Sequence, residues 1–303
     1  MSLAPIVLFV YNRPWHTRQT IEALLKNDEA SESDLIIFSD APKESSVTPD
    51  VELVRAYLKS IKGFKSVRIV EREYNLGLAK SIISGVTEVV NEYGRVIVLE
   101  DDLVTSPYFL KYMNDALKLY ENDDRVISIH GYNYPIKKPL PEAFFIKGAD
   151  CWGWATWKRG WELFEADGQK LLNELSEKNL LDRFDLFGAY NYSGMLCDQI
   201  AGKNQSWAVR WYASALLQDK LTLYPGKTLV HNIGVDASGT HFSNDDSMEV
   251  FGTEVNVFPV NITDVPIRED QNALMKQCDF LRQLNHSGIV KRIKCKLRHM
   301  VVH

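Results

Sequence analysis

Short apolar runs alternate with amphipathic stretches over the first hundred residues. The apolar runs at residues 6–11, 35–38, 67–70 and 96–99 have the length and composition of buried strands. Between them, apolar residues recur at helical spacing over residues 14–25, 51–61 and 76–90. Strands that alternate with helices of this length predict βαβ units and a mostly parallel sheet.

The pattern is less regular after residue 120. Strands are predicted at residues 126–130, 144–146, 221–224 and 228–230, and helices over residues 163–201, 207–217 and 271–284. Residues 234–246 are rich in Gly, Ser, Asn and Asp, which predicts a loop. The chain therefore divides into a regular α/β part (residues 1–135), a helical and loop-rich part (residues 136–265) and a C-terminal helix with a basic tail (residues 266–303).

The composition limits which binding partners and which cellular compartment we expect for this protein. A formal net charge of −5 over 303 residues provides no basic field, so we expect no nucleic-acid partner. No apolar run approaches the roughly 20 residues that cross a bilayer, and the first residues lack the pattern of a secretion signal. The four cysteines show no zinc or disulfide-framework spacing, so we expect free thiols and a cytoplasmic setting.

Three consecutive carboxylates, Glu100, Asp101 and Asp102, follow the strand predicted at residues 96–99. Like charges this close repel one another, and they are tolerated beside a cation or in open water. Their oxygens suit Mg²⁺ or Mn²⁺, which often carry phosphate groups as well. A solvated acidic turn is the alternative for this triplet taken by itself.

Polar residues also follow the other early strands. Arg13 follows the first strand, Asp40 the second, and Asn75 comes shortly after the third. In a parallel sheet these ends converge on one edge, where open α/β sheets bind ligands. Arg13 can bind a phosphate, and Asp40 can accept a hydrogen bond from a nucleobase or ribose. Neither a dinucleotide-binding glycine motif nor a Walker motif is present, so a metal and Arg13 would hold the phosphates.

These motifs resemble the GT-A-type nucleotide-sugar glycosyltransferases, especially family-2-like enzymes and the N-acetylglucosaminyltransferase I group. The resemblance is carried by PIVLFVYNRP at residues 5–14, FSD at 38–40, NLGL at 75–78, LEDDL at 99–103 and SPYFL at 106–110. It implies a GT-A, Rossmann-like α/β fold with a mostly parallel central sheet and helices on both faces. Residues 1–135 would be the nucleotide-sugar half and residues 136–265 the acceptor half of one domain.

The resemblance implies roles for the residues at the strand ends. Asp102 would bind the Mn²⁺ or Mg²⁺ that bridges the diphosphate, and Glu100 and Asp101 would contact ribose or sugar hydroxyls. The remaining nucleotide-sugar contacts would come from Tyr11, Asn12, Arg13, Asp40, Asn75, Gly77 and Lys80.

Four further site residues are expected in the second half, besides a catalytic base. Trp152, Gly153 and Trp154 resemble the Gly-flanked aromatic segment that contacts donor or acceptor sugar, although such rings also pack cores. His231 follows a predicted strand and would reach the metal or diphosphate, or else be structural. Asp198 is the candidate general base, with an exposed helical Asp as the alternative.

The expected reaction is metal-dependent transfer of a sugar, with inversion, from a UDP-sugar to a hydroxyl of a glycan or lipid-linked acceptor, in surface-glycan synthesis. A nucleotidyltransferase is one alternative, although the chain lacks its glycine-rich loop, and a non-catalytic carbohydrate- or partner-binding protein is another. Basic and apolar residues alternate over residues 290–298. This tail would contact the inner membrane face peripherally, or it would be a solvated end.

Overall fold

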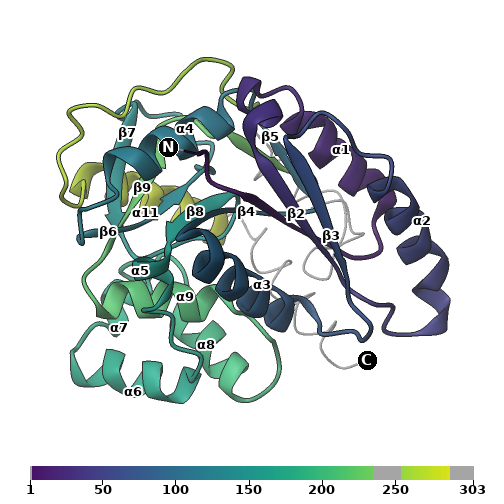
Figure 1. The fold of residues 1–303 in the computed structure, drawn as a ribbon. Coiled ribbons are helices and arrows are strands. Elements are labelled where there is room, and N and C mark those ends of the chain that lie inside the picture. The colour runs from purple at the N-terminus through teal and green to yellow at the C-terminus, as the bar shows by residue number, and fades with distance from the viewer. Residues whose placement is uncertain (1, 235–253, 287–303) are drawn as a thin grey trace.

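An eight-stranded sheet forms the centre of the protein, in the order β3-β2-β1-β4-β8-β6-β9-β7. The structure is a computed structural model that describes residues 2–234 and 254–286 (Figure 1). The first four strands along the chain are β1 (Ile6–Val10), β2 (Asp34–Ser39), β3 (Ser66–Glu71) and β4 (Arg95–Glu100). They pair in parallel, with β1 between β2 and β4. The predicted parallel half-sheet is confirmed.

The second half of the sheet contains strands of both directions. Its strands are β6 (Val126–His130), β7 (Ala143–Lys147), β8 (Trp154–Trp157) and β9 (Leu221–Pro225). β8 is antiparallel to both β4 and β6, while β9 is parallel to β6 and antiparallel to β7. A separate pair joins β5 (Leu103–Thr105) to β10 (Val230–Asn232).

Helices cover both faces because side chains of the strands alternate between two apolar layers. On one face, Ile6 and Leu8 pack with α1 (Pro14–Leu24), α2 (Thr48–Leu58) and α4 (Phe109–Leu119). On the other, Val7 and Phe9 pack with α3 (Leu78–Tyr93), α5 (Lys158–Trp161) and α9 (Ala208–Leu217). The α/β class with helices on both faces is confirmed.

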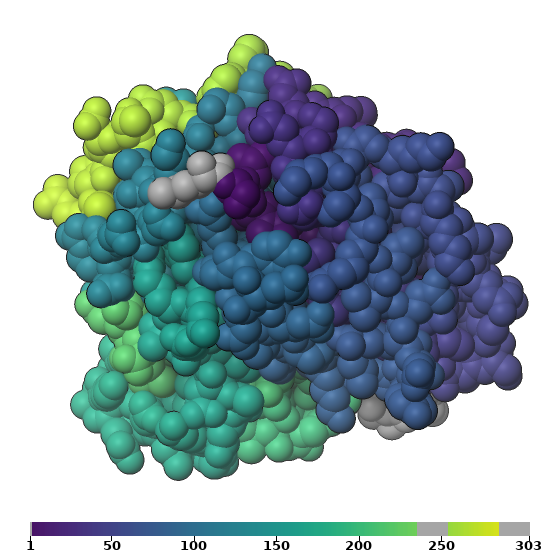
Figure 2. All heavy atoms as spheres, in the orientation of Figure 1, coloured from purple at the N-terminus to yellow at the C-terminus, as the bar shows by residue number. Residues whose placement is uncertain are grey.

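A helical region adjoins the second face of the sheet. It contains α6 (Gly168–Glu177), α7 (Leu181–Phe184), α8 (Tyr192–Ile200) and α9, which share an apolar cluster. Figure 2 shows this region, in teal and green, continuous with the surface of the first hundred residues, in purple and blue. The last described helix, α11 (Gln271–His286), packs against β7. No helix of the described ranges is both long enough and apolar enough to span a membrane.

The second half of the chain differs from the sequence expectation in a helix and in a strand of the central sheet. The helix predicted over residues 163–201 is divided among α6, α7 and α8, because turns with left-handed residues, including Asn179 and Gly188, interrupt it. β8 was not predicted as a strand, yet it lies in the middle of the sheet with Trp154 and Ala155 fully buried. A four-residue strand buried on both faces has no alternating pattern to reveal it.

The direction of β8 determines where the functional residues meet. The carboxyl ends of β1, β2, β3, β4, β6 and β9 lie at one edge of the sheet, which we call the rim. Because β8 is antiparallel to β4, the residues before β8 lie at this edge too. Residues from both halves of the chain therefore meet at the rim.

Candidate active site

Arg13 neutralises part of the acidic turn at the end of β4. Its Nη2 donates to Oδ2 of Asp102 at 2.9 Å and also to Oδ1 of Asp101, while Nε lies 3.4 Å from the other Asp101 oxygen. Asp101 is 3% exposed, so its charge depends on this pairing. The structure thus brings Arg13 and the carboxylates together, as the converging strand ends predict.

One cation faces three carboxyl groups at this turn. Burial raises the pKa of Glu100 to about 8, and repulsion from Asp102 and Asp101 adds to the shift. Burial also raises the pKa of Asp101 to about 6, against the attraction of Arg13. Burial by itself lowers the Arg13 pKa, but Asp101 and Asp102 outweigh it and the pKa is raised. Glu100 has no hydrogen-bond or ion-pair partner within the described ranges.

The backbone holds the turn from two sides. Thr20 Oγ1 in α1 donates to the Asp101 carbonyl at 2.8 Å, and the Ile233 N–H donates to the Asp102 carbonyl at 2.9 Å. A Cβ on Gly234 would overlap Asp102 Oδ2, so only glycine lets the backbone come this close. The segment after β10 therefore forms one wall of the acidic turn.

His231 lies on the strand that leads into this wall. It sits in β10, and its register partner in β5 is Val104, two residues after Asp102. The predicted metal ligand is therefore on a strand next to the acidic turn, within a strand rather than after one. The predicted loop at residues 234–246 lies outside the described residues from residue 235 onward.

Asp40 joins two loops of the rim. Its carboxylate accepts hydrogen bonds from the N–H groups of Leu76, at 2.9 Å, and of Gly77, also at 2.9 Å. Asn75 Nδ2 donates to the Ala41 carbonyl at 2.7 Å. The residues predicted after β2 and β3 are thus in direct contact, and Asp40 is 6% exposed because the loop covers it.

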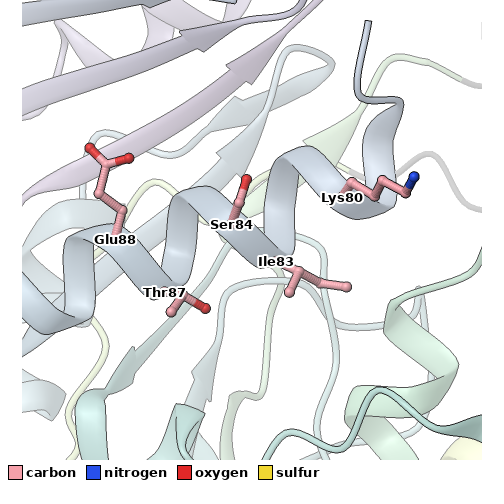
Figure 3. Close-up of a pocket in the computed structure, with 5 residues that line it drawn as sticks. All are labelled: Lys80, Ile83, Ser84, Thr87 and Glu88. Carbon is pink, nitrogen blue, oxygen red and sulfur yellow. The ribbon is translucent and has the colours of Figure 1, made fainter.

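The other nucleotide-site candidates lie around these loops. The Tyr11 hydroxyl accepts from the Lys43 N–H at 3.0 Å, and Asn12 is half-buried beside Arg13. Lys80 is exposed on the first turn of α3, one turn after Gly77. Figure 3 shows Lys80 at one end of an open groove along α3, which Ile83, Ser84, Thr87 and Glu88 also line.

The aromatic segment divides between core and rim. Trp154 is fully buried and packs against Trp161, Trp207 and Trp211, so its ring belongs to the core. Trp152 is half-buried and packs edge-on against Tyr132, with ring centroids 4.7 Å apart.

Gly153 separates the two tryptophans and has a left-handed backbone, with φ of +66°. A Cβ on Gly153 would lie 2.8 Å from Val230 Cγ2, so a larger residue would strain the backbone and collide with β10. This turn lets Trp154 enter the core while Trp152 stays at the rim.

Asp198 is on the surface of α8. Its side chain is 50% exposed and forms an ion pair with Lys203, with Nζ and Oδ1 3.2 Å apart. The loop after α8 nevertheless approaches the rim, since Gln205 Oε1 is 3.7 Å from where a Gly77 Cβ would lie. The helix that carries the predicted base therefore leads towards the site, while Asp198 itself is paired to a lysine in solvent.

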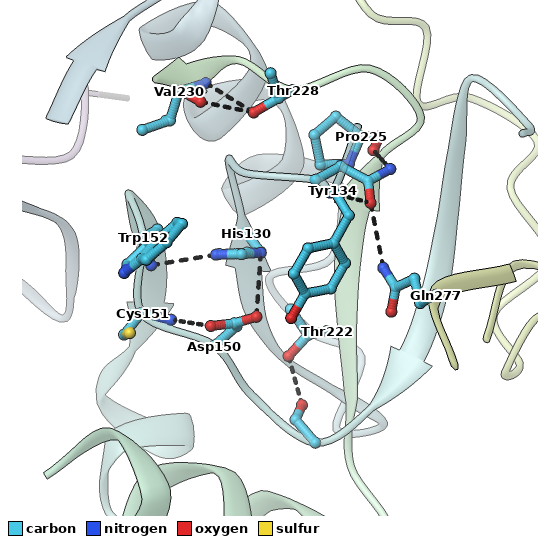
Figure 4. A network of polar contacts seen from close by, with 12 residues as sticks. His130, Tyr134, Asp150, Cys151, Trp152, Thr222, Pro225, Thr228, Val230 and Gln277 are labelled. Atoms are coloured by element: carbon cyan, nitrogen blue, oxygen red, sulfur yellow. Dashed lines mark hydrogen bonds and ion pairs between the residues drawn. The ribbon is translucent and has the colours of Figure 1, made fainter. Parts of the chain in front are cut away.

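A second polar cluster at the rim was missed by sequence reasoning. The Trp152 N–H donates to His130 Nε2 at 3.2 Å, and His130 Nδ1 lies 3.8 Å from Asp150 Oδ2 (Figure 4). Tyr132, Tyr134, Tyr192 and Tyr224 surround this pair, and the charge of Asp150 contributes to raising their pKa values after the effect of burial. Only two signals were available: Asp150 precedes the aromatic segment, and His130 ends a predicted strand.

The acidic turn fits a hard divalent cation. Mg²⁺ and Mn²⁺ are commonly bound by one or two carboxylates together with substrate phosphates. Asp102 is 15% exposed at its side chain. Glu100 has no hydrogen-bond or ion-pair partner in the described part of the chain, and its pKa is raised first by burial and then by repulsion from Asp102 and Asp101. Within residues 2–234 and 254–286, no three His, Cys, Asp or Glu side chains form a metal cage by themselves. Substrate oxygens would therefore complete the coordination.

The fold and the site together define a class. A central sheet whose parallel strand ends carry an Arg-paired acidic turn, with no glycine-rich phosphate loop, is typical of GT-A nucleotide-sugar enzymes. Residues 6–169, just over half of the chain, match the sequence profile of glycosyl transferase family 2. The chain belongs to this family.

Similar solved structures include enzymes that act on nucleotide sugars. The mannosyltransferase PcManGT from Pyrobaculum calidifontis, in complex with GDP-Man and Mn²⁺, is 15% identical with a TM-score of 0.32, covering 45% of this chain and 39% of that one. TarS from S. aureus is also 15% identical, with a TM-score of 0.31 and coverage of 48% and 24%. UDP-glucose pyrophosphorylase with UDP-glucose is 13% identical, with a TM-score of 0.31 and coverage of 54% and 79%.

These structural matches carry no argument about activity, because they are distant. The chain spans less than half of the first two proteins, at 39% and 24% of their lengths. A comparison with curated proteins finds no match. The family profile is therefore what decides against the nucleotidyltransferase alternative, and the N-acetylglucosaminyltransferase I-like part of the resemblance stays a prediction.

Proposed function

We propose that this glycosyltransferase is metal-dependent and moves a sugar from a UDP-sugar to a hydroxyl group of a glycan or lipid-linked acceptor. The observation that carries the proposal is the acidic turn, where Arg13 pairs with Asp101 and Asp102 while Glu100 has no partner among the described residues. This arrangement leaves net negative charge at the rim, which is where a divalent cation and a diphosphate would bind together.

Asp102 would hold the cation, with His231 on the neighbouring strand as a second ligand. When bound, the cation supplies positive charge for the diphosphate that departs. Arg13 lies against the same turn, so its guanidinium would also stabilise the negative oxygens of the diphosphate. Glu100 and Asp101 would contact ribose or sugar hydroxyls.

The nucleoside would lie over the loops that Asp40 joins. Tyr11, Asn12, Asn75 and Gly77 are at these loops, and Lys80 is one turn further along α3. Trp152 and Gly153 would face the sugar from the other side of the rim. Trp154 supports them from the core, since its ring is fully buried.

The reaction would be a single displacement that inverts the anomeric carbon, with one carboxylate on the acceptor side as base. Asp198 is the base expected from the sequence, and its ion pair with Lys203 must open before it can accept a proton. Surface-glycan synthesis in the cytoplasm is the pathway class and location that we propose. The basic tail that would contact the membrane lies outside the described residues.

Titration with UDP by calorimetry, with Mn²⁺ and with EDTA, tests the proposal. We expect binding that requires Mn²⁺ and is lost in Asp102→Asn, because the amide removes the charge that holds the cation. Asp115→Asn is the matched control, since Asp115 is an exposed helical carboxylate paired with Lys111. Wild-type protein that binds neither UDP nor GDP in the presence of Mn²⁺ would overturn the proposal.

A further inference from the structure

Asp150 lies at the rim opposite the acidic turn. It is four residues before β8, whose antiparallel register pairs Trp154 with Val98, two residues before Glu100. Burial raises the pKa of the Cys151 thiol, and repulsion from Asp150, Glu100 and Asp102 adds to the shift. All three carboxylates therefore act on one thiol, so Asp150 is within electrostatic reach of the turn that would hold the diphosphate.

The hydrogen bonds of His130 define which of its nitrogens faces Asp150. Because Nε2 accepts the Trp152 N–H, the neutral ring carries its own proton on Nδ1. Burial lowers the pKa of His130, and it is fully buried, so the ring is neutral near pH 7. Nδ1 is buried, lies 3.8 Å from Asp150 Oδ2 and makes no hydrogen bond of ordinary geometry in the described ranges, although the Tyr132 backbone also faces the ring.

The Asp150 carboxylate is available to a substrate. Its side chain is 34% exposed. Its Oδ1 accepts the N–H of the next residue, Cys151, at 2.8 Å, and the carboxylate also pairs with the Cys151 thiol. No Lys or Arg forms an ion pair with it in residues 2–234 and 254–286. Asp198 differs on this point, because Lys203 occupies its oxygen.

Half-buried aromatic rings complete the surroundings of Asp150. Tyr134, Tyr190 and Tyr192 pack on the cluster beside α11, with the Tyr190 and Tyr192 ring centroids 4.4 Å apart. Trp152 lies on the other side, against Tyr132. Rings beside a carboxylate match the apolar faces and hydroxyl groups of a sugar, which is the chemistry of a glycan acceptor.

We propose that Asp150 is the catalytic base for the acceptor hydroxyl and that His130 is its positioning residue. This inference rests on the proposed function and deepens it. Asp150 accepts the hydroxyl proton while the acceptor oxygen forms its bond to the anomeric carbon. The bond from that carbon to the diphosphate oxygen breaks, and the diphosphate leaves with the electron pair. The neutral Nδ1–H of His130 faces Oδ2 and orients the carboxylate.

Donor hydrolysis tests the assignment, because water then takes the place of the acceptor and needs the same base. UDP release is measured for wild type, Asp150→Asn, Asp198→Asn and the control Asp115→Asn, using whichever of UDP-glucose, UDP-galactose and UDP-N-acetylglucosamine wild type hydrolyses fastest. For Asp150→Asn we expect kcat to fall by about 10²-fold or more, the size of a general-base effect. Its UDP affinity in Mn²⁺ should stay within about twofold of wild type, since the turn at Asp102 is untouched.

The outcomes separate the two proposals. Absence of nucleotide binding by wild type overturns the proposed function and this inference with it. If Asp150→Asn binds UDP and hydrolyses the donor as fast as wild type, only the base assignment is overturned. The same holds if Asp198→Asn is the one variant whose donor hydrolysis falls by about 10²-fold. Retained UDP binding shows that each variant is folded, so a misfolded variant cannot imitate the expected result.

His130→Gln distinguishes positioning from packing. We expect lower kcat, unchanged KM for the donor and a displaced acidic limb of the pH–rate profile, because the carboxylate has lost its oriented partner. In Asp150→Asn the acidic limb should be absent. A purely structural role for His130 would leave the limb where wild type has it, and that result would overturn the positioning role.

Discussion

The two sides of the rim carry their negative charge in opposite ways. On the side of β4, Asp101 and Asp102 are crowded together and paired with Arg13, and repulsion raises the pKa of Glu100 after burial does. On the side of β8, Asp150 is a single carboxylate among tyrosines, beside a buried neutral histidine. The first side is built to bind charge, and the second leaves one carboxylate unpaired by any cation among the described residues.

The difference matches two separate chemical requirements. A diphosphate and a cation need several fixed charges that do not move during the reaction. A proton acceptor needs a carboxylate that is accessible and not held by a lysine or arginine. The catalytic base is therefore expected on the side of β8, where a carboxylate has few charged neighbours, and not at the acidic turn.

Arg13→Gln should have the largest effect on the side of β4. It leaves Asp101 buried without its partner, which we expect to lower the free energy of unfolding by about 3–5 kcal/mol. UDP affinity in Mn²⁺ should fall as well. Urea unfolding and calorimetric titration measure the two quantities.

Arg125→Gln is the control for this substitution, because Arg125 pairs with Asp123 on the surface, where solvent screens the pair, and its loss should leave stability nearly unchanged. Arg13→Gln with wild-type stability would show that Arg13 does not neutralise the turn. The contrast between the two sides of the rim would then disappear.

Substitution of the two tryptophans should separate core from rim. Trp154→Ala should lower the free energy of unfolding by about 3–5 kcal/mol, because the ring is fully buried among three other tryptophans. Trp152→Ala should cost less stability and lower the rate of donor hydrolysis. Thermal melts and UDP release measure these effects, and a Trp152 variant with full activity would contradict its place in the site.

The pH dependence of stability should have opposite signs on the two sides of the rim. The Glu100 pKa is raised from 4.5 to about 8, so the folded state holds a proton that the unfolded state has lost, and stability rises as pH falls from 8 towards 4.5. The His130 pKa is lowered from 6.5, so stability falls as pH falls below 6.5.

Urea unfolding in EDTA between pH 8 and 5 measures both slopes. Glu100→Gln should remove the first and His130→Gln the second. If neither substitution changes the dependence of stability on pH, the two sides of the rim do not differ in charge as described.

Much of the side of β4 was predictable from local patterns. The four parallel strands, the helices between them and the convergence of Arg13 with Asp101 and Asp102 all follow from apolar runs with polar ends. Free thiols were also expected, and Cys151, Cys197 and Cys278 are free. The pairing of Asp40 with the Gly77 N–H was not foreseen, because it depends on two loops that are adjacent only in space.

The side of β8 was much less predictable. Trp154 and Trp152 have the same residue type and differ by two positions, yet one is core and the other lies at the rim, because the left-handed Gly153 turns the chain between them. β8 was missed because it is only four residues long and buried on both faces. Asp150 and His130 are 20 residues apart, and no spacing rule connects them.

The sequence by itself determined the order of strands and helices in the first half, the acidic turn and the family. These depend on local periodicity and on motifs that are contiguous along the chain. Only the tertiary structure decided that β8 runs antiparallel beside β4, which of two tryptophans is buried, and that His130 faces Asp150. Those outcomes depend on pairings between distant segments, whose energies are set by burial and close packing that no local pattern records.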